Sequence, residues 1–264
     1  MSKLSVVVSL FILSSFSSLY AQANTPETMV FSPPYLKQGL PTGTMAYLRL
    51  PNPWGLIAAP NQNTFKDALQ ASATVTATSK IRYNMQTRIF DKLPANTQPL
   101  LRLLNSHLVS PIEAALIPAD DPRVKLPYLA LGFTTDIRDM KTFGELLVQL
   151  TASAKEIGLV SPITEKGMAV LVMANIPIYV KFFPETGRCL AMGGMMLDIV
   201  TFTRLMKTFE EQKTRIVLPE AEVDSGGQGL FLWLDAQRLM PLVTADMLPE
   251  ERAEMALTGL NKLS

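Results

Sequence analysis

The stretch that decides the fold is Met168–Met192, MAVLVMANIPIYVKFFPETGRCLAM, which holds three apolar runs separated by short breaks. The runs cover residues 168–174, 178–183 and 188–192, and the breaks between them contain Asn, Pro and Gly. Short apolar runs joined by such short connections predict neighbouring antiparallel strands. We therefore expect these three runs to form a meander of neighbouring strands.

Amphipathic helices are expected on both sides of this meander. Asp139 and Asp198 are candidate N-caps, and each precedes apolar residues at helical spacing. These residues are Met140, Phe143, Leu146, Leu147 and Leu150 after Asp139, and Ile199, Phe202, Leu205, Met206 and Phe209 after Asp198. The two sets are offset by 59 residues, and each helix follows an apolar run, 126–134 or 188–192. The offset favours repeated strand–helix units, although any two amphipathic helices share part of this spacing.

The remaining chain adds strand candidates at 44–50 and 112–117 and helix candidates at 64–90 and 97–107. Together these elements predict an α+β fold with a mixed or antiparallel sheet and packed amphipathic helices. We expect a mixed sheet, because single helices connect some of the strands.

Residues 1–23 have the three parts of a secretory signal peptide: Lys3, an apolar Ser-rich run at 4–20, and Ala21-Gln22-Ala23. We expect cleavage after Ala23 and export, with the periplasm of a Gram-negative bacterium as the destination. Serines interrupt the apolar run, and no later segment is apolar over the ~20 residues that a spanning helix needs. The mature chain is therefore expected to contain no transmembrane span.

The composition excludes several classes of function. Lys3 is one of 24 basic residues, so cleavage leaves 23 basic against 23 acidic residues. A neutral chain lacks the basic surface of a nucleic-acid-binding protein. A single Cys excludes a disulfide scaffold, and a single His excludes most His-based metal sites.

The domain organisation follows from changes in composition along the chain. After the signal peptide we expect an extended, Pro-rich segment at 24–43, an α+β domain at 44–214 and a polar, Gly-rich linker at 215–229. A new strand begins near residue 230, so 230–264 is expected to start a second, incomplete α+β unit.

Three stretches carry a resemblance to known proteins: Leu40–Trp54 (LPTGTMAYLRLPNPW), Ser110–Glu113 (SPIE) and Phe231–Asp235 (FLWLD). On these residues the chain resembles a family of exported bacterial cell-envelope proteins that contain a domain of unknown function. Family members are longer and continue where this chain ends, which raises the question whether the chain is truncated at Ser264. The resemblance implies export and repeated α+β units, but no reaction and no functional residue.

No motif of a hydrolase, kinase, metalloprotease or nucleotide-binding protein occurs, and we expect no cofactor and no metal. His107 is the only imidazole base, with Ser106 and Ser110 as nearby hydroxyls, and its position at a helix end favours a role in capping over catalysis. Cys189 lies within an apolar strand candidate, which favours burial over reactivity.

The candidate ligand-binding residues are apolar. Met192, Met195, Met196 and Phe202 are expected to line an adaptable groove, because Met side chains suit varied partners. Trp54 lies between Pro53 and Gly55 and is either an exposed contact or a cover over the core. An envelope protein, an apolar small molecule or a lipid is the expected partner.

Three hypotheses for the function remain open. The leading one is a non-catalytic envelope protein that binds a protein partner or an apolar ligand, which an apolar cavity would favour. The second is a periplasmic hydrolase with dispersed acidic residues, which two carboxylates across a cleft would favour. The third is a structural envelope component, which a filled core with a large exposed apolar patch would favour.

Overall fold

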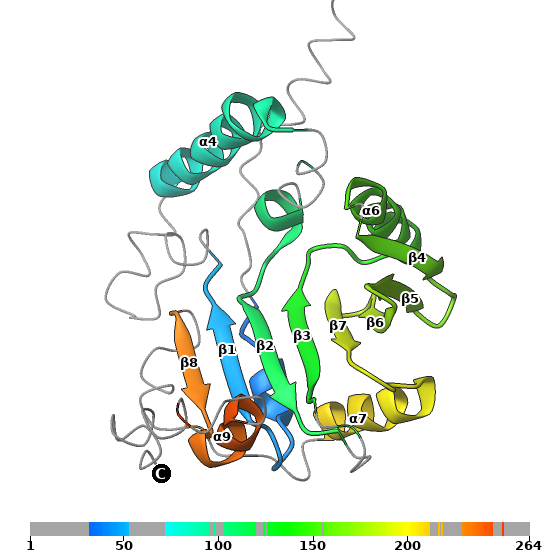
Figure 1. The fold of residues 1–264 in the computed structure, drawn as a ribbon. Coiled ribbons are helices and arrows are strands. Elements are labelled where there is room, and N and C mark those ends of the chain that lie inside the picture. Colours follow the sequence, from blue (N-terminus) through cyan, green and yellow to red (C-terminus); the bar gives the residue numbers. More distant parts are fainter. Residues whose placement is uncertain are drawn as a thin grey trace, which may run out of the picture.

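A computed structural model describes residues 32–52, 72–94, 98, 103–119, 124, 126–154, 156–211, 216, 218, 229–244 and 250. The described strands form one eight-stranded sheet in the order β4-β5-β6-β7-β3-β2-β1-β8 (Figure 1). The strands are β1 Ala46–Leu50, β2 Ile112–Ile117, β3 Tyr128–Thr134, β4 Ile157–Ser161, β5 Met168–Met173, β6 Ile176–Phe183, β7 Arg188–Gly193 and β8 Phe231–Leu234. The expected α+β class is confirmed.

Helices and helical turns accompany the sheet. They are η1 Leu36–Gly39, α4 Ser72–Arg88, η3 Phe90–Lys92, η4 Leu103–His107, α6 Met140–Ser153, α7 Ile199–Glu211 and α9 Ala236–Thr244. In Figure 1, α4 stands apart from the sheet, whereas α6 lies at the β4–β7 end and α7 runs along the lower rim.

The predicted meander is confirmed as β5, β6 and β7. Ala174 and Asn175 both have positive φ angles, 49° and 63°, which allow a two-residue connection between β5 and β6. The expectation of a mixed sheet was wrong, because every strand pair is antiparallel. The helix α6 leads from β3 to the edge strand β4 and not to a parallel neighbour, since β7 occupies the position beside β3.

Both predicted helix starts are confirmed by their capping bonds. The Asp139 carboxylate accepts the Thr142 backbone N–H at 2.7 Å, and the Asp198 carboxylate accepts that of Thr201 at 2.7 Å. These bonds satisfy N–H groups that have no partner within the first turn of a helix.

The two helices nevertheless cover opposite faces of the sheet. The ring of Phe143 in α6 stacks on Phe182 of β6 with centroids 4.1 Å apart, while Phe202 of α7 lies in the cluster that contains Met192 of β7. The 59-residue offset that aligns the two helices therefore does not align the strands before them. Side chains alternate between the two faces along a strand and 59 is an odd number, so residues 59 apart in these strands point to opposite faces.

Each face of the sheet carries a buried cluster. The α7 face is formed by Tyr47, Ala115, Ala130, Leu190 and Met192 with residues of η1 and α7. The α6 face, over β5, β6, β7 and β3, is formed by Ala169, Val180, Phe182 and Cys189 with residues of α6. The core is thus divided by the sheet into two layers of packed side chains.

Residues 32–43 differ from the extended segment that the sequence predicts. The 3₁₀-helix η1 interrupts the extended backbone, and its first residue Leu36 and its C-cap Leu40 are fully buried on the α7 face. The prolines set the chain direction, but the two leucines make this segment part of the core.

The strand expected near residue 230 is present and belongs to the main sheet. β8 pairs antiparallel with β1, with Trp233 opposite Tyr47. Phe231–Leu234 therefore does not open a sheet of its own, because β1 supplies its backbone partner. Most of 215–229 and 245–264 lies outside the described residues.

Candidate binding site

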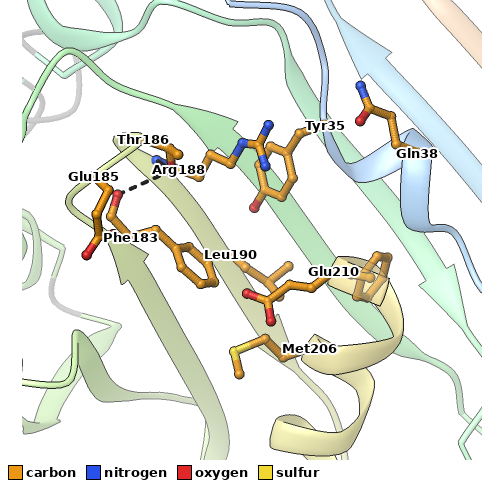
Figure 2. Close-up of a pocket in the computed structure, with 10 residues that line it drawn as sticks. Tyr35, Gln38, Phe183, Glu185, Thr186, Arg188, Leu190, Met206 and Glu210 are labelled. Carbon is orange, nitrogen blue, oxygen red and sulfur yellow. Dashed lines mark hydrogen bonds between the residues drawn. The ribbon is translucent and has the colours of Figure 1, made fainter. Parts of the chain in front are cut away.

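A pocket of about 310 Å³ lies on the α7 face, between η1, α7 and the hairpin of β6 and β7 (Figure 2). Phe183, Leu190, Met206 and Phe209 give it an apolar lining, and Tyr35 closes one side. Gln38 and Thr186 add polar groups at its edge. A concave, mostly apolar lining with a few polar groups is the usual composition of a ligand-binding site.

The buried carboxylate of Glu113 positions the η1 wall of this pocket. It accepts the backbone N–H groups of Tyr35, Leu36 and Lys37 at 2.7–2.8 Å, and the Tyr47 hydroxyl donates to it at 2.8 Å. These bonds satisfy the amide groups at the start of η1, which have no partner in so short a helix. Burial raises the pKa of the Glu113 carboxyl, and the four donated hydrogen bonds oppose that rise.

The close approach of η1 to α7 depends on a glycine. A Cβ atom at Gly39 would lie 2.1 Å from the carbonyl oxygen of Phe209. The absence of a side chain at Gly39 therefore lets η1 pack directly against the last turns of α7, where Met206, Phe209 and Glu210 line the pocket.

The rim of the pocket carries three charged side chains from different elements. Arg188 comes from β7, Glu185 from the turn before it and Glu210 from α7, and Figure 2 shows all three around the apolar lining. None of them forms an ion pair with another described residue. The Arg188 guanidinium lies over the Tyr35 ring at 5.2 Å from its centroid, which holds the cation at the pocket wall.

Tyr35 is held in place at both ends. Its backbone N–H is bound by Glu113, and its hydroxyl donates to the Cys189 carbonyl at 2.6 Å. Burial raises the pKa of the Tyr35 hydroxyl, so the ring remains a neutral wall.

The structure does not gather the residues that the sequence predicted as ligand contacts. Met192 and Phe202 are fully buried in the core on the α7 face, whereas Met195 and Met196 are exposed to solvent. Trp54 lies outside the described residues. A groove lined jointly by these methionines and Phe202 is therefore not formed, because the buried positions are already filled by packing.

The pocket residues were missed because their signal is dispersed along the sequence. Tyr35, Arg188 and Glu210 are far apart in the chain and belong to no motif. The only local indication is the polar pair Glu185-Thr186 in the turn between two apolar strands, which is also usual for a plain hairpin.

His107 is paired with a carboxylate, as a triad would require, but no nucleophile completes the arrangement among the described residues. Its Nδ1 lies 2.9 Å from the Asp136 carboxylate, near the surface. The Ser110 hydroxyl is buried, donates to the Pro111 carbonyl and accepts the Thr134 backbone N–H. Ser110 therefore fixes the backbone between η4 and β2.

Cys189 is buried, and burial raises the pKa of its thiol. A neutral thiol enclosed in the core is a weak nucleophile. Within the described ranges, no group of three or more His, Cys, Asp or Glu side chains is placed to hold a metal ion. Within the same ranges, no helix is both long and apolar enough to cross a bilayer.

Comparison with known proteins finds no matching family model, no matching curated protein and no matching solved structure.

Proposed function

We propose that this chain is an exported, non-catalytic protein of the bacterial cell envelope that binds a peptide segment of a partner protein. The observation that carries the proposal is the pocket in Figure 2, in which an apolar lining is surrounded by Arg188, Glu185 and Glu210 without ion-pair partners among the described residues. The signal-peptide pattern of residues 1–23 supports export.

The chemistry of the pocket favours a peptide over a simple lipid. The lining of Phe183, Leu190 and Met206 accepts one large apolar side chain. At the rim, Arg188 can pair with an acidic group and the two glutamates with a basic group. A fatty acid supplies only the acidic group, and its carboxylate would lie near the like charges of Glu185 and Glu210. A peptide supplies both charges on residues beside the apolar anchor.

The size of the pocket agrees with an anchor residue. Its volume of about 310 Å³ is at the lower end of the roughly 300–1,000 Å³ of small-molecule sites. Buried anchors of this kind supply much of the affinity of protein interfaces, while the surrounding charges select the partner.

Site-specific photo-crosslinking in the periplasm tests the proposal. A photoreactive residue at Thr186, on the pocket rim, is expected to crosslink one protein, which mass spectrometry identifies together with the attached peptide. The same residue at Glu145 on α6 is the matched control, because it is exposed and does not line this pocket. Equal labelling from both positions, or none from Thr186, contradicts the proposal.

Charge reversal then tests the rim with the identified peptide. Arg188→Glu and Glu210→Lys are each expected to weaken binding about tenfold or more, since each replaces an attraction by a repulsion. Lys141→Glu, an exposed charge on α6, is expected to have little effect.

The hydrolase alternative has one observation in its favour, which is that Glu185 and Glu210 line the same pocket. Both residues are exposed, whereas the acid of a paired-carboxylate enzyme needs an apolar enclosure to keep its proton near neutral pH. Hydrolysis of a panel of aryl glycosides that is lost in both Glu185→Gln and Glu210→Gln would establish this alternative in place of simple binding.

A further inference from the structure

A second apolar feature lies away from the pocket, in the loop before α7 and the first turn of that helix. Met195, Met196, Ile199 and Val200 are 51%, 62%, 45% and 72% exposed, although all four are large and apolar. Leu197, between them in sequence, is buried in the core and anchors the loop. We call the four exposed residues the α7 tip.

The backbone of the α7 tip is held in one conformation. The Leu197 N–H donates to the Gly194 carbonyl at 3.3 Å, and Asp198 caps the helix through Thr201. A Cβ atom at Gly194 would lie 2.4 Å from the Tyr128 ring, so the loop packs closely on β3. Met196 has a φ angle of 57°, an uncommon conformation for a residue with a side chain. The exposed side chains are therefore displayed by a fixed loop.

Basic residues follow the apolar ones on the same side of the helix. Ile199, Val200, Thr203, Arg204 and Lys207 line one shallow groove, and both basic side chains are exposed. The Asp198 carboxylate, which directly precedes Ile199 and Val200, is bound to the N–H of Thr201, and the other acidic residues of this helix, Glu210 and Glu211, lie at its far end. Apolar side chains beside Lys and Arg are the arrangement of segments that lie in the interface of a bilayer.

We propose that the α7 tip inserts into the interfacial layer of a membrane that contains anionic lipids. The four apolar side chains enter the boundary between headgroups and acyl chains, and Arg204 and Lys207 face the lipid phosphates. A protein partner is a poorer fit, since four side chains cover much less than the ~800 Å² per partner of a stable interface. This binding is peripheral and does not depend on the pocket.

Vesicle co-sedimentation tests the proposal with the protein purified from the periplasm. Mass spectrometry first establishes that its leader is absent, because an uncleaved apolar leader would itself bind lipid. The protein is expected to sediment with vesicles of phosphatidylglycerol and phosphatidylethanolamine, and about tenfold less with pure phosphatidylcholine. The variant Met196→Ser/Val200→Ser is expected to lose most of this binding.

Two further sets of variants make the result specific. Val148→Ser/Val160→Ser removes two other exposed apolar side chains and is expected to bind vesicles as the wild type does. Arg204→Gln/Lys207→Gln is expected to lose the preference for anionic vesicles. In the variant Met196→Trp, brominated lipid is expected to quench the fluorescence of the added tryptophan. The quenching should therefore be larger than in the wild type, which has only its own tryptophans.

Three outcomes overturn the proposal. The first is no sedimentation with either vesicle, and the second is equal loss in the tip variant and in the Val148/Val160 control. The third is self-association that only the tip substitutions abolish, because that result identifies the tip as an interface between copies of the chain.

Discussion

At the residue scale, buried polar side chains organise the molecule. Tyr47, Arg49, Asn52, Ser110 and Glu113 are all buried. Arg49 lies opposite Glu113 in the pairing of β1 with β2, and its Nε donates to the Gly229 carbonyl at 2.9 Å. These five residues belong to the stretches 40–54 and 110–113. Their contacts show that those stretches hold the N-terminal segment and the edge of the sheet together.

Glu113→Gln is expected to lower the free energy of unfolding by about 3 kcal/mol. The substitution replaces one carboxylate oxygen by an amide NH₂ group, which cannot accept the hydrogen bonds that the η1 backbone and the Tyr47 hydroxyl donate. Urea unfolding measures the change. Glu145→Gln, at an exposed position on α6, is the matched control and is expected to change stability by less than about 0.5 kcal/mol. A loss below about 1 kcal/mol for Glu113→Gln would show that η1 does not depend on this carboxylate.

At the element scale, the two long helices on the sheet begin in the same way. The backbone N–H groups of Thr142 and Thr201 hold the pKa values of Asp139 and Asp198 below their ordinary value of 3.8. A lowered pKa in the folded state means that each cap stabilises the fold above pH 3.8 and loses this effect as the pH falls through the folded pKa.

NMR titration of the side-chain carboxyl carbons is therefore expected to give pKa values below 3.8 for both aspartates. In Asp139→Asn/Asp198→Asn the caps remain as hydrogen-bond acceptors but no longer titrate. The melting temperature of the wild type should fall more steeply than that of this variant below about pH 4. Parallel curves for the two proteins would contradict the assigned role of the caps.

The packing of η1 on α7 gives a second prediction at this scale. Gly39→Ala places a Cβ atom against the Phe209 carbonyl, which is backbone and cannot rotate away. We expect a loss of about 2 kcal/mol or more in the free energy of unfolding, with weaker peptide binding because the pocket wall moves. Gly158→Ala is the control, since its closest contact is a Val172 side-chain atom at 3.1 Å. Equal effects of the two substitutions would contradict this account.

The sequence predicted those elements whose signals are local. The meander, the two caps and the strand at 231–234 follow from turn residues, N-cap side chains and apolar runs. β4 was missed, because Ile157–Ser161 is a short run in which Gly158 interrupts the apolar residues. The antiparallel order could not be read, since the choice of β7 as the neighbour of β3 depends on long-range packing. The pocket was missed for the same reason, because Tyr35, Arg188 and Glu210 meet only in the folded chain.

At the scale of the whole molecule, the α6 face of the sheet is unevenly covered. The helix α6 packs over the β5–β7 half, whereas leucines on the other half remain exposed by 44–58%. These are Leu50, Leu129, Leu232 and Leu234. Exposed apolar surface of this kind is typical of interaction sites and of aggregation-prone proteins.

Leu232→Thr/Leu234→Thr is expected to reduce binding of a hydrophobic dye and self-association at high concentration, with a change in unfolding free energy below about 1 kcal/mol. Dye fluorescence and sedimentation velocity measure the two effects. Val160→Thr, on the opposite edge strand, is the control and is expected to leave dye binding nearly unchanged. Unchanged dye binding in the double variant would show that the dye does not bind at these leucines.

The pairing of β1 with β8 also has a consequence for the order of events during synthesis. One side of β1 stays open until Phe231–Leu234 leaves the ribosome, because that late segment is its partner. Contacts between such distant parts of a chain form slowly, since a long loop must close first. If the chain is exported, as we propose, this delay keeps the sheet incomplete while the chain is being synthesised. On that proposal, the late synthesis of β8 favours an incompletely folded chain that is competent for export.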